Sequence, residues 1–214
     1  YTNDMQDNPI TEQQHREFYE KDHVTGAFAR YFCDSIFLIV LCLPAFVIID
    51  LLLKDKRCKM NTLIYPRTES SAKIIITRFV AVGCMTMLPI LILPVKSLLT
   101  LVLYCHNIGI PVNIFAFAAY IFAWIFPTVL FVVSVALFVT ILTENYSAVL
   151  LAGLIWLFCR PSVDKLAGGN YGLFDLIIRH NTLKGYGRMI ENIHTLILNR
   201  VLVSVIAILF VGFA

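Results

Sequence analysis

Ionisable side chains in apolar surroundings are the first candidates for chemistry in this chain. Asp34 lies near the start of the apolar run 31–53, and Lys96 closes a second run, 74–96. A charged group at membrane depth is costly and often marks a substrate or ion pathway. Each residue also has a simpler interpretation, Asp34 as an interfacial anchor and Lys96 as a cation that reaches the membrane surface along its flexible stem. Both are therefore candidate pathway residues.

Sequence motifs for catalysis are absent. The chain lacks the phosphate-binding pattern GxxxxGK[ST], the zinc-binding pattern HExxH and the nucleophile pattern GxSxG. Its six cysteines occur without CxxC or Cys/His ligand spacing, and so resemble small buried hydrophobic residues. We therefore predict that the chain is not an enzyme and has no catalytic, cofactor-binding or metal-binding residues of its own.

The composition indicates a membrane protein. Hydrophobic residues make up 59% of the 214 residues and charged residues 14%, with a mean hydropathy of +0.80. Soluble domains carry about 25% charged residues, and a soluble chain of this length could not hide so much apolar surface. The basic residues gather at the ends of apolar runs rather than along a polar face, so nucleic-acid binding is not supported.

Five apolar runs are expected to cross the membrane as helices in an all-α polytopic bundle, since about 20 residues span the hydrocarbon core. They are residues 31–53, 74–96, 112–142, 146–159 and 199–214. Pro89 and Pro94 are expected to bend the second helix, which should finish near Lys96. A further span is expected before Tyr1.

Small residues point to a contact between helices in the fourth run. Ala148, Ala152 and Gly153 would let another helix approach closely, as small residues do in membrane helix pairs. These three positions are therefore candidates for the interface between two copies of the chain.

A basic loop at residues 54–73 sets the predicted orientation. It and the adjoining start of the next run contain Lys54, Lys56, Arg57, Lys59, Arg67, Lys73 and Arg78 against only Asp55 and Glu69. Short basic loops beside spans are retained in the cytoplasm. Residues 1–30 and 160–198 are then extracellular, although the second stretch is also rich in basic residues.

The order of these features resembles the membrane subunit of ABC-2 type ATP-binding-cassette exporters. The family's basic loop carries a proline turn followed by a lysine or arginine, which here is similar to residues 63–69 with Pro66, then Lys73 and Arg78. A short turn between two spans is similar to Thr143–Asn145. The external stretch before the last span corresponds to residues 160–199 and ends in Asn199-Arg200. The acidic-glycine pair that often precedes the family's proline turn is missing.

The resemblance implies six spans in a type V exporter-like architecture, and two permease copies that form the substrate pathway. A separate ABC ATPase subunit would bind ATP and Mg²⁺ and dock on the loop 54–73. The candidate coupling residues in that loop are Lys56, Arg57, Tyr65, Pro66, Arg67, Glu69 and Lys73. The expected location is the bacterial plasma membrane, with the chain in contact with lipid.

Several functions remain open at this point. The leading hypothesis is a permease for an amphipathic peptide, an antibiotic or a lipid, because the spans carry little charge. The basic loop has a second interpretation as an anchor to anionic lipid, with about 1 kcal/mol per basic residue near the surface. The alternative function is a membrane sensor or assembly factor whose outer segments, 1–30 and 160–198, bind an external ligand.

Overall fold

The computed structural model describes residues 23–58, 70–143 and 185–213, together with positions 149–150, 153–154, 172–173 and 176. Within these ranges every regular element is a helix, and no strand occurs. The elements are α3 (His23–Arg57), α5 (Ser71–Ile108), α6 (Ala116–Tyr120), the π-helix η2 (Ile121–Ile125), α7 (Phe126–Thr143), α9 (Gly185–Glu191) and α10 (Ile193–Phe213).

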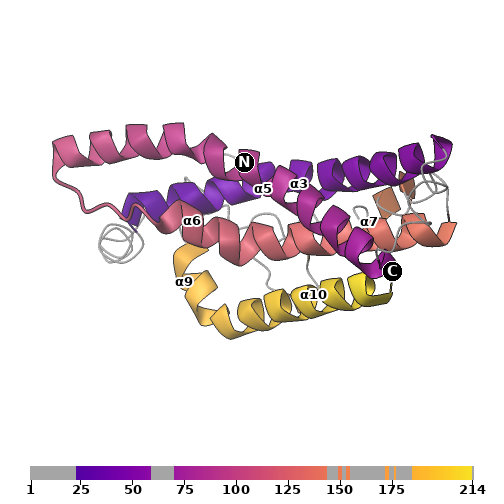
Figure 1. The fold of residues 1–214 in the computed structure, drawn as a ribbon. Coiled ribbons are helices and arrows are strands. Elements are labelled where there is room, and N and C mark those ends of the chain that lie inside the picture. Colours follow the sequence, from indigo (N-terminus) through magenta and orange to yellow (C-terminus); the bar gives the residue numbers. More distant parts are fainter. Residues whose placement is uncertain are drawn as a thin grey trace.

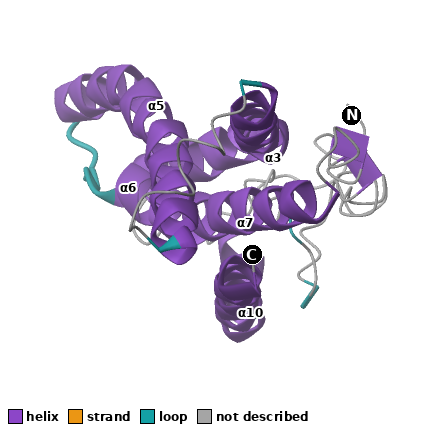
Figure 2. Cartoon of the chain, turned by 45° about the vertical axis from the view of Figure 1, so that its right-hand side comes forward, coloured by secondary structure: helices purple, strands orange, loops and turns teal. Residues whose placement is uncertain are grey.

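The run formed by α6, η2 and α7 is the centre of the bundle. In its most apolar stretch 61% of the residues are buried, against 22% in α5 and 28% in α10. Figure 2 shows α7 between α3 on one side and α10 on the other, with α5 crossing over the group. Thus α5 and α10 are peripheral helices whose outer faces are left open.

The helix directions define two ends of the bundle (Figure 1). The end of α3, the start of α5 and the end of α7 lie at one end, which we call the basic end because Lys56, Arg57 and Lys73 are there. The start of α3, the α5–α6 connection and α9 lie at the opposite end. α10 runs in the same direction as α7, as expected if the predicted span 146–159 crosses between them. That span lies almost wholly outside the described residues.

Three helical runs are long and apolar enough to cross a membrane: 72–108, 116–143 and 193–213. α3 becomes a fourth if its two halves, His23–Phe37 and Ile39–Arg57, are counted as one bent span. These halves meet at 44°. Pro44 lies inside α3, and proline kinks a helix at the turn before it because its ring meets the carbonyl four residues earlier. The break between the two halves, at residue 38, precedes the proline by more than one turn.

The second predicted helix differs in length from its expected bounds. α5 does not finish near Lys96 but continues to Ile108, for 38 residues, with Pro89 and Pro94 inside it. The prolines change its direction, as Figure 1 shows, without ending it. The helix ends at Gly109, whose φ of 77° is readily adopted only by a residue without a Cβ.

The central run contains a π-helical turn at η2. The N–H of Phe126 donates to the carbonyl of Ile121, five residues back, where an α-helix would bond four residues back. Pro127, the second residue after the turn, has no N–H to offer the preceding turn. Such π-helical turns are frequent at functional sites and re-aim the side chains around them.

Two helices start earlier than the sequence predicted. α3 begins at His23 rather than residue 31, because Thr25 and Arg30 are buried in the bundle and the Thr25 hydroxyl accepts a hydrogen bond from the Asn113 N–H at 3.1 Å. α10 begins at Ile193 rather than residue 199. As a result Asn199 and Arg200 lie a third of the way along α10, inside the bundle.

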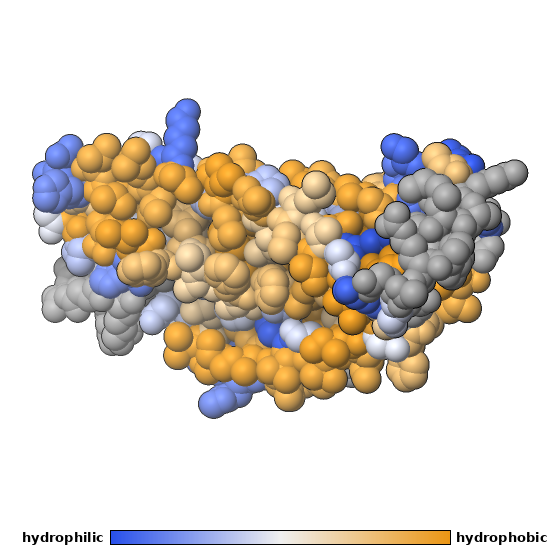
Figure 3. Space-filling view, viewed as in Figure 1, coloured by the Kyte–Doolittle hydropathy of each residue, from blue (hydrophilic) through white to orange (hydrophobic). Residues whose placement is uncertain are grey.

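Apolar side chains cover most of the face seen in Figure 3, over helices from both the centre and the periphery. Large exposed residues on α5 and α10 contribute to this surface, among them Leu88, Ile92, Leu99, Val201 and Ile208. A contiguous apolar surface of this size suits the hydrocarbon region of a bilayer. The all-helical chain is therefore described as a membrane protein.

Candidate functional site

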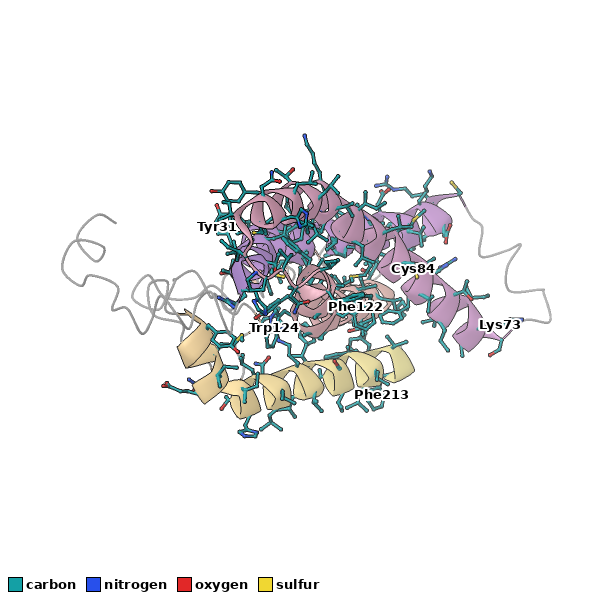
Figure 4. The ribbon with its side chains drawn as sticks, turned by 90° about the vertical axis from the view of Figure 1, so that its left-hand side faces the viewer. Tyr31, Lys73, Cys84, Phe122, Trp124 and Phe213 are labelled. Carbon is teal, nitrogen blue, oxygen red and sulfur yellow. The ribbon has the colours of Figure 1, made fainter. Side chains whose placement is uncertain are left out.

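The basic end joins the inner parts of α3 and α5. Lys54, Lys56, Arg57 and Lys73 are exposed there, and Lys73 lies near the tip of α5 in Figure 4. Arg78 of α5 forms an ion pair with Asp55 of α3, and both side chains are half-buried. This pair ties together the two helices on either side of the basic loop.

The predicted coupling residues are only partly described. Lys56, Arg57 and Lys73 are exposed at the basic end, as a docking surface requires. Four others, Tyr65, Pro66, Arg67 and Glu69, lie outside the described residues.

Three of the candidate pathway and interface residues are described, and they lie on different helical segments. Asp34 is half-buried on α3, whereas Lys96 is exposed on α5. Gly153 is exposed, and a Cβ added there would meet no atom within 4 Å. Ala148 and Ala152 lie outside the described residues.

A buried arginine marks a different site. Arg200 of α10 is only 6% exposed, and its Nη1 donates to the Thr128 hydroxyl at 2.8 Å and to the Trp124 carbonyl at 3.3 Å. Its Nη2 donates to the Leu176 carbonyl at 3.2 Å. The guanidinium carbon lies 6.0 Å from the centre of the Trp124 ring, within range of a cation–π interaction. Figure 4 shows Trp124 on the side of the central run that faces α10.

The partners of Arg200 are all neutral. Among the described residues it has no carboxylate within ion-pair distance, and its Nε has no hydrogen-bond partner. A buried charge without an opposite charge loses hydration that neutral carbonyls and hydroxyls only partly replace. Within the described part of the chain, the guanidinium is therefore a positive charge without an opposite charge beside it.

Asn199, next to Arg200, is fully buried and fastens residues 172–173 to α10. Its Nδ2 donates to the carbonyls of Leu173 at 2.8 Å and Gly172 at 3.2 Å. With the Arg200–Leu176 bond, α10 thus makes polar contacts to Gly172, Leu173 and Leu176. These bonds help to hold the surroundings of Arg200 in place.

A second buried arginine lies nearer the opposite end. Arg30 of α3 is 2% exposed, and its Nη1 donates to the Tyr120 hydroxyl at 3.1 Å. Its guanidinium carbon lies 5.8 Å from the ring centres of both Tyr120 and Tyr186. The Tyr120 hydroxyl in turn contacts the sulfur of Met189 at 3.8 Å.

The two arginines are connected by aromatic rings. Tyr120 and Trp124, one turn apart around η2, have ring centres 6.2 Å from each other. Arg30 faces Tyr120 and Arg200 faces Trp124. The row therefore links α3, the central run and α10.

A groove of about 580 Å³ runs beside this row, between the central run and α10. Its walls are almost entirely apolar, and Arg200 is the charged residue among them. The lining residues are Ala119, Tyr120, Ala123, Trp124, Pro127, Met189, Ile193, Ile197, Arg200, Val201, Ser204, Val205 and Ile208. Among the described lining residues the polar groups include the Arg200 guanidinium and the Tyr120 and Ser204 hydroxyls.

Sequence reasoning did not find this site. It placed Arg200 at the membrane boundary and counted Arg30 as part of an external segment. One feature of the sequence could have indicated the site: Arg200 lies seven residues into the helix that starts at Ile193. An arginine at that depth needs buried partners. The Trp124 ring that faces Arg200 belongs to a π-helical turn, and the pattern of apolar residues does not predict the register of such a turn.

Comparison with protein-family models, with curated proteins and with solved structures finds no match to this chain.

Proposed function

We propose that this chain is the permease subunit of an ATP-driven exporter of the ABC-2 type, located in the plasma membrane. A separate ATPase subunit binds ATP and Mg²⁺, and a second permease copy completes the pathway. Two kinds of observation support this proposal: the resemblance around Pro66 and Lys73, and a helical bundle with exposed lysine and arginine side chains at one end. The substrate class is an amphipathic peptide, an antibiotic or a lipid.

The observation that carries the proposal is the ion pair between Asp55 and Arg78 at the basic end. α3 ends at Arg57 and α5 begins at Ser71, so the docking loop joins these two helices and the ion pair ties them a few residues inside. A partner that pulls on the loop therefore displaces both helices together.

The bends in α3 and α5 are places where such a displacement can change the direction of each helix. α3 bends by 44° in its middle, and α5 changes direction near Pro89 and Pro94. Both helices pack against α7. Helix segments on either side of a proline bend can reorient with little loss of hydrogen bonding. Motion at the basic end is thereby passed to the central run.

The basic end also attracts anionic lipid, which is the simpler role for its charge. Polybasic segments gain about 1 kcal/mol per lysine or arginine near an anionic surface. Lipid attraction depends on charge alone, whereas docking on an ATPase depends on the shape of the loop as well. Substitutions that keep the charge and change the shape separate the two roles.

The test is co-purification with an ATPase encoded in a neighbouring reading frame that contains a phosphate-binding loop. The full chain and the ATPase are expressed together, captured through a tag on the chain, and assayed for ATP hydrolysis in nanodiscs. Pro66→Ala changes the loop and keeps its charge. Glu69→Gln removes one carboxylate and makes the loop more positive, which favours attraction to anionic lipid, so weaker capture of the ATPase cannot come from weaker lipid attraction. Pro111→Ala, in the exposed connection at the opposite end, is the matched control.

The proposal predicts that Pro66→Ala and Glu69→Gln each weaken capture of the ATPase about tenfold or more, which is about 1.4 kcal/mol of binding. ATP hydrolysis stimulated by the permease falls in parallel, and Pro111→Ala behaves as wild type. Unchanged capture together with unchanged turnover in both loop variants removes the coupling role. A chain that never captures the ATPase but binds a ligand through residues 1–30 or 160–198 is the sensor or assembly factor instead.

A further inference from the structure

We propose that the groove between the central run and α10 binds a single-chain amphiphile with one acidic head group, such as a long-chain carboxylate, and that Arg200 receives the acidic group. This inference goes beyond the exporter proposal and does not depend on it, because binding at the groove requires no ATPase. Its support comes from the charge of Arg200, the hydrogen-bond donors of its guanidinium, the shape of the groove and the access to the groove from the bilayer.

Charge is the first step. Arg200 is buried, charged and surrounded by neutral partners among the described residues. An arginine at the centre of a membrane helix costs about 2.5–3.5 kcal/mol on insertion scales. An anion that enters the groove gains an opposite charge already stripped of water, where attraction is stronger than at an exposed site.

Donor geometry is the second step. A guanidinium has five N–H donors. Two on Nη1 are used by Trp124 and Thr128, and one on Nη2 is used by Leu176. Two donors remain, one on Nη2 and one on Nε. The Nε atom is buried and has no hydrogen-bond partner among the described residues, so an acid in the groove reaches it after a small displacement of the side chains around it. Two donors are what a carboxylate takes in a bidentate pair with arginine.

The shape of the groove is the third step. Along α10 its apolar wall repeats every three or four residues, from Ile193 through Ile197, Val201 and Val205 to Ile208. At 1.5 Å per residue these positions span about 22 Å, which exceeds the ~15 Å depth of one leaflet. A volume near 580 Å³ holds about 20 non-hydrogen atoms at ~30 Å³ each. That is enough for one long acyl chain with its head group.

Access is the fourth step. The facing wall contains Ala119 and Ala123, whose small side chains are exposed and leave the groove open along its length. Ser204, the remaining small polar residue of α10 in the groove, already donates its hydroxyl to the Arg200 carbonyl at 2.8 Å. The Arg200 guanidinium is thus the group in the groove that would bind a polar head group. An apolar chain can enter the groove sideways from the bilayer.

The experiment uses the full chain in nanodiscs of zwitterionic phosphatidylcholine. The probes are a photoreactive long-chain fatty acid and the matched uncharged alcohol, and crosslinked peptides are located by mass spectrometry. Arg200→Met removes the charge and keeps an apolar side chain of similar length. Ala123→Phe fills the groove at an exposed position and leaves Arg200 in place. Ala81→Phe, at an exposed position of α5 outside the groove, is the matched control.

The expected result is saturable labelling of wild type by the fatty acid at the walls of the groove. Labelling falls about tenfold or more in Arg200→Met, whereas labelling by the alcohol falls far less. Ala123→Phe reduces labelling by both probes, and Ala81→Phe changes neither. Equal labelling of wild type and Arg200→Met by the fatty acid overturns the role of the arginine, and labelling unaffected by Ala123→Phe overturns the site.

Competition on the wild-type chain keeps the proposal testable even if Arg200→Met does not fold. Unlabelled fatty acid should displace the fatty-acid probe at concentrations at which the unlabelled alcohol does not. Equal displacement by both compounds means that the groove recognises only an apolar chain, and the proposal fails.

Discussion

At the basic end, where α3 finishes and α5 begins, the side chains of Lys54, Lys56 and Arg57 are exposed to the surroundings. Toward the opposite end Arg30 is 2% exposed and, deeper in the bundle, Arg200 is 6% exposed. The residue types are the same, yet their surroundings differ completely. Exposed cations keep their hydration and act at a distance on partners and lipids, whereas buried cations must be held by specific neighbours.

The comparison indicates that exposed and buried cations in this chain serve different roles. Exposed charges at the basic end can be exchanged for one another with small effect on stability, because solvent screens them. The buried arginines depend on Tyr120, Trp124 and Thr128, whose positions follow from the π-helical turn before Pro127.

Trp124→Ala should have the largest effect on stability. The ring is 7% exposed and lies against both Tyr120 and Arg200, so its removal leaves a cavity beside a buried charge. A loss of about 3–5 kcal/mol in unfolding free energy is expected. Thermal unfolding of the detergent-purified chain measures it. Phe122→Ala, two residues away on the same turn but 52% exposed, is the control and should cost far less. Equal losses in the two variants would contradict the described orientation of the turn.

Asn199→Leu should follow. The substitution leaves the carbonyls of Gly172 and Leu173 without the donor that they now share, at a cost of about 1–3 kcal/mol. The exposed Asn107 of α5, changed to leucine, provides the matched control. The same thermal assay applies, and a melting temperature that drops no further than in Asn107→Leu would show that these bonds do not stabilise the folded chain.

Tyr120→Phe should have a smaller effect. It removes the hydroxyl that accepts a hydrogen bond from Arg30 and keeps the ring that both Arg30 and Trp124 face. A loss of about 1–2 kcal/mol is expected, since the bond involves a charged donor. The comparison is Tyr104→Phe at a residue that is 62% exposed. Identical unfolding curves for the two variants would argue against a buried Arg30.

The ion pair of Asp55 with Arg78 should contribute least to stability. Both side chains are accessible to solvent, at 25% and 22%, so a double-mutant cycle of Asp55→Asn and Arg78→Gln should give a coupling energy below about 1 kcal/mol. High salt should reduce it further. A coupling of several kcal/mol that is insensitive to salt would mean that the basic end is shielded, and the contrast between the two ends would disappear.

The sequence allowed the general architecture to be predicted, for reasons visible in particular residues. The long apolar runs and the sparse charge predicted a helical membrane protein, and the described part of the chain is all helical. The clustering of Lys54, Lys56 and Arg57 after the first run marked one end of the bundle. The prolines predicted bends, but not that α5 would continue beyond Lys96 to Ile108, because a bent helix and an ended one share the same local pattern.

The buried site was beyond sequence reasoning because it depends on contacts between distant segments. Arg200 meets Thr128 and Trp124, more than seventy residues away, and Arg30 meets Tyr120, 90 residues away. A run of apolar residues shows that a helix forms but not which of its faces meets which neighbour. The π-helical turn shifts those faces once more, so the convergence of rings and arginines required the three-dimensional arrangement.

The central claim is that the basic end faces the cytoplasm and the opposite end faces outward. Cys58 is exposed at the basic end, and His106 is exposed near the end of α5 at the other. A chain whose only cysteine is Cys58, and a second whose only cysteine comes from His106→Cys, are treated in intact cells with a membrane-impermeant maleimide. We predict labelling of the second chain in intact cells and of Cys58 only after permeabilisation. Labelling of Cys58 in intact cells would invert the orientation and contradict the exporter proposal.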